Sequence, residues 1–472
     1  MTVITVLLIL AFVFCFYVAW NIGANDVANA VGTSVGSGAL TLRRAVILAA
    51  IFEFCGAFFF GSQVSETVEG GIVNLAVFSE NTLDYVYGML GALLAAGVWL
   101  QVASFFGWPV STTHTIVGAV IGFGLIYGGF GAIYWGELSS ILASWFISPL
   151  LGGSLAYLIF TVLRRRIFYS PLPVQAAQRM TPYLVLSFFF IISLIIFFQG
   201  LGNIKLSLNI FQAVGLSLLI GVLASLISLF LIRRYSKHED KPSKELQQLQ
   251  AFMVLKKAES SLSRVGAFAT EELNDRVQPL LDKLRALTEE MKGKEQDAPP
   301  SEYRKVEKLF ISLQLITACA MAFAHGSNDV ANAIGPVAAI VNVLTGHNIT
   351  DIHSVPIYLL FLGGAGIVIG LATWGWRVIE TVGTKITDLT PSRGFAAGFG
   401  AAITIVLASK LGLPISTTHV IVGAVLGVGF ARGIGAINLY TCRDILISWI
   451  VTVPAGAILS VVFFYCLKAI FS

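Results

Sequence analysis

Long apolar runs, separated by short polar segments, fill most of the chain. A helix needs about 20 apolar residues to cross the ~30 Å hydrocarbon core of a bilayer, and many of the runs reach that length. Two further apolar regions, 85–130 and 394–433, are interrupted in the middle by Gly, Pro, Ser and Thr. The pattern predicts an all-α polytopic membrane protein with about twelve membrane helices, counting four hairpin arms. The predicted spans are 3–42, 43–62, 137–163, 181–198, 208–232, 309–345, 355–377 and 440–470.

Three arginine clusters orient these spans, because cytoplasmic loops carry an excess of Lys and Arg. Of the two possible orientations of the spans, one places all three clusters on the inner side, namely Arg43–Arg44, Arg164–Arg166 and Arg233–Arg234. Both termini then lie outside. Region 85–130 leaves and returns on the outer side as a re-entrant hairpin, and region 394–433 does so from the cytoplasm. We therefore expect a multi-pass protein of the cell (inner or plasma) membrane.

Three segments recur in one order at an offset of 303 to 305 residues. GANDVANA (23–30) returns as GSNDVANA (326–333), PVSTTH (109–114) as PISTTH (414–419), and ILASW (141–145) as ILISW (445–449). The parity of the spans reverses between the copies, which predicts two inverted-topology repeats, an arrangement typical of secondary transporters. The predicted organisation is a first transmembrane repeat (1–163), additional transmembrane helices (164–233), a cytoplasmic helical loop (234–308) and a second, inverted repeat (309–472).

The charged residues are concentrated in one segment. The chain is 56% hydrophobic, which exceeds what a soluble domain buries. Of its 30 basic and 26 acidic residues, more than half lie between Arg233 and Lys308. Leucines at helical spacing in this segment predict a cytoplasmic helical hairpin, with no indication of a ligand. The net charge of +4 gives no reason to expect nucleic acid as a partner.

The repeated Asn-Asp motifs are candidates for cation binding. Each lies in the middle of an apolar run of nearly 40 residues, so we expect a helix break or a strong tilt there. A carboxylate at membrane depth is expensive and normally marks an ion or substrate path. Carboxylate, amide and freed carbonyl oxygens suit a hard cation such as Na⁺, although helix capping or interhelical hydrogen bonding is the alternative. The predicted cation ligands are Asp26, Asn29, Asp329 and Asn332, with Na⁺ at Asp26 and Asp329.

The repeated STT segments are candidates for oxyanion binding. A proline precedes each one, and the serine is a good N-cap for the glycine-rich helix that follows. Free N–H groups, hydroxyls and the positive end of a helix dipole then meet inside the bilayer, although the hydroxyls could serve as caps alone. The predicted phosphate-binding residues are Ser111, Thr112, Thr113, Ser416, Thr417 and Thr418, with Asn25 and Asn328 beside them.

Neither motif contains Lys or Arg, so an anion bound there needs cations to balance its charge. This makes cation coupling a physical expectation. Carboxylates also favour phosphate over sulfate if they touch the anion, because phosphate near neutral pH still has a proton to donate. If the carboxylates bind only cations, this discrimination does not apply.

Three further ionisable residues lie in the apolar regions. Glu53 is a third intramembrane acid, which binds a coupling ion or carries a proton unless it is only a buried, hydrogen-bonded glutamate. The span 355–377 of the second half has no matching acid. His114 and His419 follow the STT segments, where each is either a proton carrier or a hydrogen-bonded structural histidine.

The paired GANDVANA/GSNDVANA and P-[VI]-STTH segments resemble those of the inorganic phosphate transporter (PiT) family. The resemblance covers both transmembrane halves and leaves the 234–308 loop aside. It implies cation-driven phosphate uptake, inverted repeats and a homodimer. It also implies cations around the Asn-Asp motifs and phosphate between the STT segments. Members of the family differ in whether Na⁺ or H⁺ drives transport, and relatives have been assigned to sulfate.

The predicted function is therefore import of inorganic phosphate by symport with a cation through alternating access, with Na⁺ favoured over H⁺. A sulfate or metal-phosphate symporter of the same fold is the alternative. An anion channel is disfavoured, because acidic residues would repel anions in an open pore. The chain is not expected to be an enzyme, since it shows no nucleophile–base pair or metal cluster. The expected partners are phosphate, the coupling cation, the lipid bilayer and a second copy of the chain, with no other cofactor.

Overall fold

A computed structural model describes residues 2–70, 72–199, 208–235, 244–268, 271–292, 301–346 and 355–471. Within these ranges every regular element is a helix, and the one β-type pairing is an isolated bridge between Val73 and Ile133. Ten helical segments of the described part are long and apolar enough to cross a bilayer. The prediction of an all-α polytopic membrane protein is confirmed.

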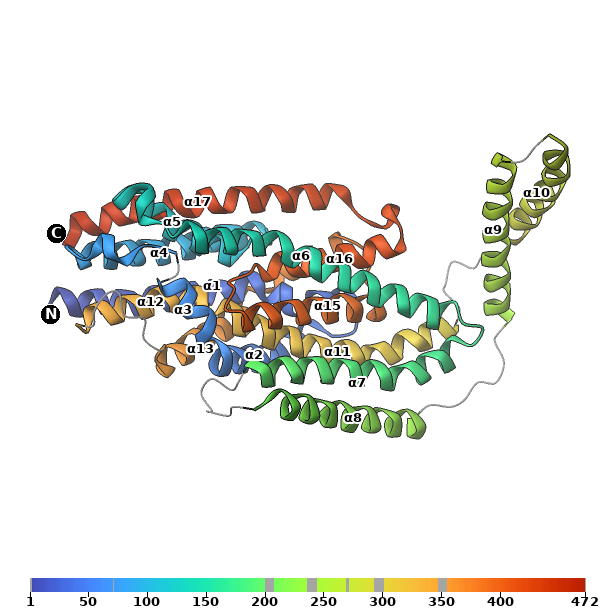
Figure 1. Cartoon of the computed structure of the whole chain (residues 1–472), viewed down its shortest axis with the longest axis horizontal. Coiled ribbons are helices and arrows are strands. Elements are labelled where there is room, and N and C mark those ends of the chain that lie inside the picture. Colours follow the sequence, from blue (N-terminus) through green and yellow to red (C-terminus); the bar gives the residue numbers. More distant parts are fainter. Residues whose placement is uncertain are drawn as a thin grey trace. The chain divides into compact units, whose positions relative to one another are not determined.

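The order of the helices follows the repeat (Figure 1). The first half contains α1 (Val3–Gly36), α2 (Leu42–Phe60), α3 (Ser62–Gly70), η1 (Leu75–Phe78), α4 (Thr82–Phe106), α5 (Thr112–Gly128), η2 (Gly129–Ala132), α6 (Trp135–Leu163) and η3 (Arg164–Phe168). Next come α7 (Pro173–Gln199), α8 (Ile210–Tyr235), α9 (Lys244–Phe268) and α10 (Glu271–Lys292). The second half contains α11 (Ser301–Asp329), α12 (Ala331–Leu344), α13 (Ile357–Trp374), α14 (Trp376–Glu380), η4 (Thr381–Lys385), α15 (Pro391–Lys410), α16 (Thr417–Arg432), η5 (Ile434–Ala436) and α17 (Leu439–Phe471).

The two Asn-Asp motifs lie on differently built helices. The break expected in the first motif is wrong, because α1 is one continuous helix of 34 residues. In the second copy α11 ends at Asp329 and α12 begins at Ala331. The second copy also carries Pro336, which has no N–H to donate, but α12 is continuous through this residue, so the proline does not by itself account for the break at Val330. The first copy has Thr33 at the position of Pro336.

Both interrupted regions form helical hairpins. The chain turns between α4 and α5 through Gly107 (φ +68°) and between α15 and α16 through Gly412 (φ +66°). Glycine adopts this left-handed backbone without the steric penalty that other residues meet. Each second arm then begins at the threonine that follows an N-cap serine, Ser111 or Ser416.

Helices of one half pack closely on helices of the other. α1 lies on α13 and α2 lies on α11, and in each pair glycines let the backbones approach so closely that a Cβ atom would overlap a carbonyl oxygen. Equivalent helices also run in opposite directions, α1 against α11 and α6 against α17 (Figure 1), as inverted repeats require. The four glycine–carbonyl contacts are Gly23–Ile367, Gly370–Trp20, Gly326–Glu53 and Gly56–Phe323.

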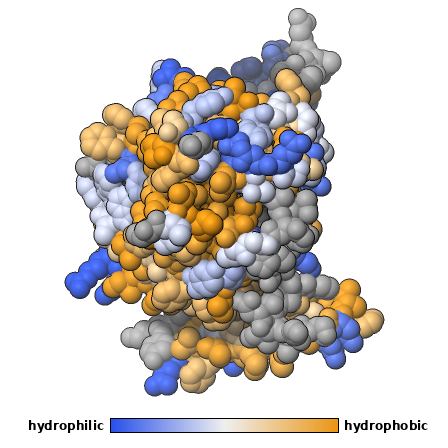
Figure 2. Space-filling model, turned by 90° about the vertical axis from the view of Figure 1, so that its left-hand side faces the viewer, coloured by the Kyte–Doolittle hydropathy of each residue, from blue (hydrophilic) through white to orange (hydrophobic). Residues whose placement is uncertain are grey.

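Large apolar side chains remain on the outside of the helices. Figure 2 shows hydrophobic residues gathered over much of one face. Phe146 and Leu150 on α6, and Ile450 and Ile458 on α17, are each at least 65% exposed. In water such an extended apolar surface would favour association, whereas hydrocarbon solvates it.

The chain divides into two compact units, one of residues 1–161, 186–223 and 310–472, the other of 162–185 and 224–309. In the second unit α9 packs on α10 as the leucine spacing predicted, with Val277 and Leu281 buried. An ion pair of 3.5 Å joins Arg285 Nε to Glu259 Oε1. The domain boundaries derived from the sequence remain a prediction. Every site residue described below lies in the first unit.

Candidate functional site

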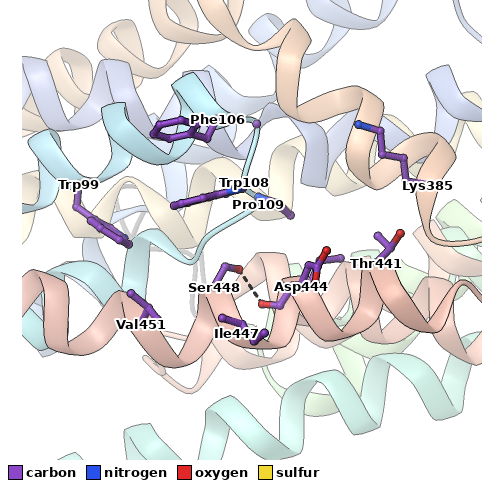
Figure 3. Close-up of a pocket in the computed structure, with 12 residues that line it drawn as sticks. Trp99, Phe106, Trp108, Pro109, Lys385, Thr441, Asp444, Ile447, Ser448 and Val451 are labelled. Carbon is purple, nitrogen blue, oxygen red and sulfur yellow. Dashed lines mark hydrogen bonds between the residues drawn. The ribbon is translucent and has the colours of Figure 1, made fainter.

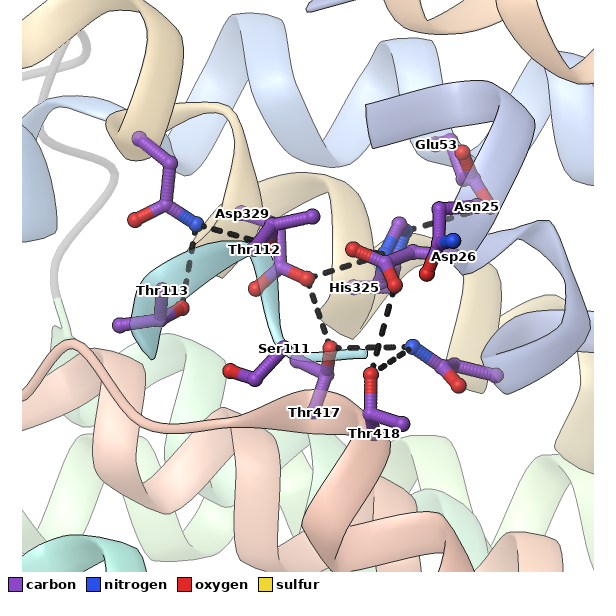
Figure 4. A network of polar contacts seen from close by, with 12 residues as sticks. Asn25, Asp26, Glu53, Ser111, Thr112, Thr113, His325, Asp329, Thr417 and Thr418 are labelled. Atoms are coloured by element: carbon purple, nitrogen blue, oxygen red, sulfur yellow. Dashed lines mark hydrogen bonds and ion pairs between the residues drawn. The ribbon is translucent and has the colours of Figure 1, made fainter. Parts of the chain in front are cut away.

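The two Asn-Asp motifs and the two hairpin tips meet in one buried polar network (Figure 4). α1 brings Asp26, the end of α11 brings Asp329, and the first turns of α5 and α16 bring the threonines of both STT segments. All of the predicted site residues are at most 2% exposed. The fold therefore places acids and hydroxyls together although they are far apart in the sequence.

Two asparagines hold the hairpin turns to the Asn-Asp motifs. Asn25 Nδ2 donates to Ser104 Oγ and to the Trp108 carbonyl, each at 3.1 Å. Its copy Asn328 donates to Ser409 Oγ at 3.0 Å and to the Leu413 carbonyl at 3.2 Å. Both amide N–H₂ groups are thus used inside the protein. Their Oδ1 atoms are buried without a hydrogen-bond partner, so the group that each offers to a ligand is an acceptor, which suits a cation better than phosphate.

The other two asparagines cross from one half to the other. Asn29 Nδ2 donates to Thr418 Oγ1 at 2.9 Å and lies 3.4 Å from Thr417 Oγ1. Asn332 Nδ2 donates to Thr113 Oγ1 at 3.1 Å and to Thr112 Oγ1 at 3.2 Å. Each Asn-Asp motif therefore binds the hairpin tip of the opposite half, and its asparagine Oδ1 again lacks a partner.

The hairpin tips also bind each other. Thr113 Oγ1 donates to the Ile415 carbonyl at 2.9 Å, and Thr418 Oγ1 donates to the Val110 carbonyl at 3.1 Å. The serines are the N-caps that the sequence predicted, because Ser111 Oγ accepts from the backbone of His114 and Ser416 Oγ accepts from that of His419. The N-termini of two helices, each with a partial positive charge, thus converge on one place.

The threonines connect these tips to the acids. Thr417 Oγ1 donates to Asp329 Oδ2 at 2.6 Å, and Thr418 Oγ1 lies 3.3 Å from Asp26 Oδ1. The remaining oxygens, Asp26 Oδ2 and Asp329 Oδ1, are buried without a hydrogen-bond donor. Together with the four asparagine oxygens, the two Asn-Asp motifs thus have six buried acceptors without a donor, and a cation would satisfy them.

His325 is a site residue that the sequence reasoning missed. Its Nε2 lies 3.0 Å from Asp329 Oδ2 and 4.0 Å from Asp26 Oδ2, while its Nδ1 lies 3.3 Å from Glu53 Oε1. The histidine and all three of these acids are buried. A signal was present in the sequence, because His325 directly precedes the repeated motif and its counterpart in the first copy is Ile22.

Glu53 is therefore bound to the network through His325. Gly326 packs against the Glu53 backbone as Gly23 packs against that of Ile367, so Ile367 is the counterpart of Glu53. The ligand atoms of Asp26, His325 and Asp329 lie within 4.8 Å of one another, as a metal site requires. The Glu53–His325 pair is thus found only around Asp329. The other polar residues of the site occur around both aspartates.

The two histidines after the STT segments stack with tryptophans. The rings of His114 and Trp145 have centroids 3.7 Å apart, and those of His419 and Trp449 are 3.5 Å apart. His114 and His419 meet edge to face at 4.2 Å. Both histidines thus pack against tryptophans and each other, but the hydrogen bonds of the structural alternative are missing at both ring nitrogens of His114 and at Nε2 of His419.

Comparisons with known proteins identify the family to which the chain is similar. A family model described as the phosphate transporter family matches residues 22–460. A putative phosphate permease of Chlamydia pneumoniae is 49% identical over 456 residues, covering 97% of each chain. The chloroplastic inorganic phosphate transporter 2-1 of Arabidopsis thaliana is 42% identical over 466 residues, covering 97% of this chain and 72% of the relative. The solved structure of a sodium-dependent phosphate transporter matches with a TM-score of 0.77 and 36% identity, covering 98% of this chain and all of the other.

Proposed function

The chain belongs to the phosphate transporter family, and on that basis we propose that it imports inorganic phosphate by symport with Na⁺ through alternating access. The observation that carries this proposal is the crossed network, in which each Asn-Asp motif binds the opposite hairpin tip beside six unpaired acceptor oxygens. A site with two helix N-termini and several unpaired oxygens suits an anion and cations bound together.

Phosphate fits between the hairpin tips. The first backbone N–H groups of an α-helix have no acceptor within the helix, and those of α5 and α16 converge here. The threonine hydroxyls add donors, which exchange their present acceptors for phosphate oxygens when the anion binds. Ser111 and Ser416 hold the helix ends in place through their capping bonds. The proposed phosphate ligands are therefore the backbone and hydroxyl groups of Thr112, Thr113, Thr417 and Thr418.

Cations fit on the other side of these threonines. Asp26 and Asp329 provide carboxylate oxygens, and Asn29 and Asn332 provide amide oxygens without a donor. Because the Oδ1 atoms of Asn25 and Asn328 are also free while their N–H₂ groups are occupied, we reassign these two residues from phosphate to the cations. An all-oxygen set favours Na⁺, in keeping with the sodium-dependent protein whose structure is similar. Proton coupling through His325 and Glu53 is the alternative.

A metal-phosphate complex is the second candidate substrate. It is favoured by one observation, the Asp26–His325–Asp329 cluster, whose imidazole adds a nitrogen ligand to two carboxylates. Such a mixed set suits a transition-metal ion better than Na⁺. If a metal-phosphate complex is the substrate, chelation of divalent metal should abolish phosphate uptake even with a full Na⁺ gradient.

Uptake of labelled phosphate into proteoliposomes tests the proposal. We expect uphill uptake when a Na⁺ gradient is imposed at constant pH, little uptake under a pH gradient alone, and no competition from excess sulfate. Asp26→Asn and Asp329→Asn should each reduce gradient-driven uptake at least ~100-fold, because losing the charge of a buried group typically costs about 3–5 kcal/mol. The exposed Arg43→Gln, distant in sequence from every site residue, is the control. Unchanged uptake in both aspartate variants would remove the cation assignment.

The remaining parts of the proposal concern the surroundings of the site. We propose that the protein is a homodimer in the cell membrane, with both termini outside and the 234–308 loop in the cytoplasm. A cleavable tag at either terminus should be accessible to protease in intact cells. A tag inserted in the 234–308 loop should become accessible only after lysis, and cross-linking in the membrane should give a species of twice the chain mass.

A further inference from the structure

The long helices α6 and α17 carry matching polar stripes. In each helix polar residues recur at positions i, i+3, i+7 and i+11, which places them on one face. The two stripes correspond at an offset of 304 residues. Polar side chains of membrane helices normally face the protein interior or a water-filled cavity. The stripes are Glu137, Ser140, Ser144 and Ser148 on α6, and Thr441, Asp444, Ser448 and Thr452 on α17.

The stripe on α17 lies along a groove of about 450 Å³. Trp99 and Val451 lie at one end of the groove, and Lys385 and Asp444 lie at the other (Figure 3). Beyond the inner end, Trp99 Nε1 donates to Thr452 Oγ1 at 3.3 Å. The groove therefore follows α17 from its beginning, where the charged residues are, into the apolar part of the helix.

The wall of this groove is the turn between α4 and α5. Trp108 and Pro109 line the groove with their side chains. The carbonyls of the same turn face the site, where Trp108 accepts from Asn25 and Val110 accepts from Thr418, each at 3.1 Å. One short turn thus contacts both the groove and the polar network.

The equivalent place beside α6 is closed. Trp145 Nε1 donates to the Pro414 carbonyl at 3.2 Å and so fastens α6 to the turn between α15 and α16. By the repeat, Trp449 corresponds to Trp145 and Pro109 to Pro414. Trp449 Nε1 is buried without an acceptor, and Pro109 lines the open groove. We call these two tryptophan–proline pairs latches, of which one is closed and the other open.

The stripe on α6 is correspondingly shut in at its inner end. Ser144 and Ser148 are 7% and 5% exposed, and Ser148 Oγ has no hydrogen-bond partner. A buried hydroxyl without a partner is costly. By the repeat, Ser148 corresponds to Thr452, which lies next to the open groove, so we infer that Ser148 lines an equivalent path that is closed here. The two stripes are thus chemically alike but differ in their access to water.

We propose that the groove beside α17 is the path by which phosphate reaches the site from one side of the membrane, and that the α6 stripe lines the equivalent path to the other side. The path opens and closes by exchange of the latches, so that Trp449 binds Pro109 when Trp145 releases Pro414. This inference rests on the proposed function and adds the route by which phosphate reaches the binding site. In the predicted topology the α17 path opens to the cytoplasm.

Lys385 is suited to attract phosphate to this path. Its exposed side chain lines the outer end of the groove, and within the described part of the chain its ammonium group makes no ion pair of 4.0 Å or less. A cation at the mouth of a path raises the local concentration of an anionic substrate. Lys385→Gln should therefore raise the KM for phosphate supplied on the side to which this groove opens, measured by efflux or exchange, roughly 3- to 10-fold at low ionic strength, and the effect should fall at high salt.

Cysteine accessibility tests the route directly. In an active variant without its native cysteines, Ser448→Cys and Ser148→Cys are labelled with a charged thiosulfonate that does not cross membranes. Ser448→Cys should react roughly tenfold faster than Ser148→Cys, and from one side only, because a single conformation predominates. Phosphate with Na⁺ should slow the reaction. Ile458→Cys, on the lipid-facing surface of the same helix, is the control and should not react. The cysteines to be replaced are Cys15, Cys55, Cys319, Cys442 and Cys466.

The latch tryptophans provide a paired test. Trp145→Phe keeps a ring against His114 but removes the N–H that binds Pro414. It should shift labelling from Ser448→Cys toward Ser148→Cys by roughly fivefold, the ratio that one hydrogen bond corresponds to. Trp449→Phe is the matched variant, and it should shift the labelling ratio by a similar factor in the opposite direction, because its N–H binds Pro109 only in the other conformation. A plug in the groove, Ser448→Trp, should block uptake without changing the gel-filtration profile.

The outcomes separate the route from the function. If phosphate uptake is Na⁺-driven but Ser448→Cys does not react, or reacts equally from both sides, the route is wrong and the proposed function stands. If Ser448→Cys reacts only with a membrane-soluble maleimide, the groove holds a lipid chain and the route is also wrong. If uptake of phosphate fails in the parent protein while Ser448→Cys reacts as expected, the groove is a water-filled path for another solute.

Discussion

The two halves of the site differ at one pair of positions. Around Asp329, α11 and α2 supply His325 and Glu53, whereas around Asp26 the equivalent helices α1 and α13 supply Ile22 and Ile367. All four side chains are fully buried, and the glycines that bring the helices together are equivalent. The backbone arrangement therefore does not need the ionisable pair. The duplicated Asn-Asp motifs and STT segments form the site. The unduplicated pair, Glu53 and His325, gives the two ends of the site different electrostatic surroundings.

The largest effect should come from separating the unduplicated pair. Glu53→Ile leaves the buried Nδ1 of His325 without its acid partner, although Nε2 still faces Asp329, and we expect it to lower the free energy of unfolding by about 3–5 kcal/mol. The double variant Glu53→Ile/His325→Ile recreates the apolar packing of the other half, and replacing a buried pair in this way is often neutral or stabilising. Thermal unfolding in detergent measures the stability of both variants.

Uptake by the same double variant shows what the pair contributes. We expect the double variant to be folded but impaired in transport, since Asp329 then lacks its imidazole partner and keeps only the hydrogen bond from Thr417. Equal stability of the single and double variants would show that Glu53 and His325 do not form a coupled pair. Normal transport by the double variant would show that the asymmetry has no part in the function.

A smaller and equal effect is expected for the glycines that both halves share. Gly23→Ala and Gly326→Ala each place a Cβ against a carbonyl of a neighbouring helix. Overpacking of this kind costs about 1–3 kcal/mol, and both variants should lower the unfolding temperature by similar amounts. Gly215→Ala on α8, where an added Cβ meets nothing within 4 Å, is the control. A clear difference between the first two would mean that the two helix pairs are not equivalent.

The smallest effect should come from the helix caps. Ser111→Ala and Ser416→Ala each remove one capping bond to a backbone N–H, of 3.1 and 3.2 Å. Such a change costs about 1 kcal/mol, and we expect equal losses of stability in the two variants. Ser79→Ala, in an exposed turn, should have almost no effect. If one cap variant alone abolished uptake, its hydroxyl would be a phosphate ligand rather than a cap.

The duplicated part of the site could be predicted from the sequence, because each of its motifs occurs in two copies. Ser111 and Ser416 were identified as caps, and the two hairpins were recognised as apolar regions interrupted by Gly, Pro, Ser and Thr, since turn chemistry and N-cap preferences are local. The meeting of the Asn-Asp motifs with the STT segments followed from inversion of the repeat. The crossing of Asn29 to the second hairpin was not predicted, because it depends on how helices pack.

The unduplicated part was not predictable in the same way. His325 lies just outside the motif that was compared between the halves, and its importance depends on Glu53, which is 272 residues earlier (325 − 53). The continuity of α1 was also missed, because the length of an apolar run does not determine where a helix bends. The donors of Asn25 and Asn328 were assigned to phosphate from their position alone, whereas the folded turns already use them.

The glycine contacts have a consequence for the origin of the repeat. α1 belongs to the first half and α13 to the second, while α2 belongs to the first and α11 to the second. A half on its own would therefore leave its closest helix-packing surfaces uncovered. A chain of half this length would need another copy, inserted into the membrane the opposite way round, to complete both pairs. The present molecule has the arrangement of such an antiparallel dimer, with its two subunits joined in one chain.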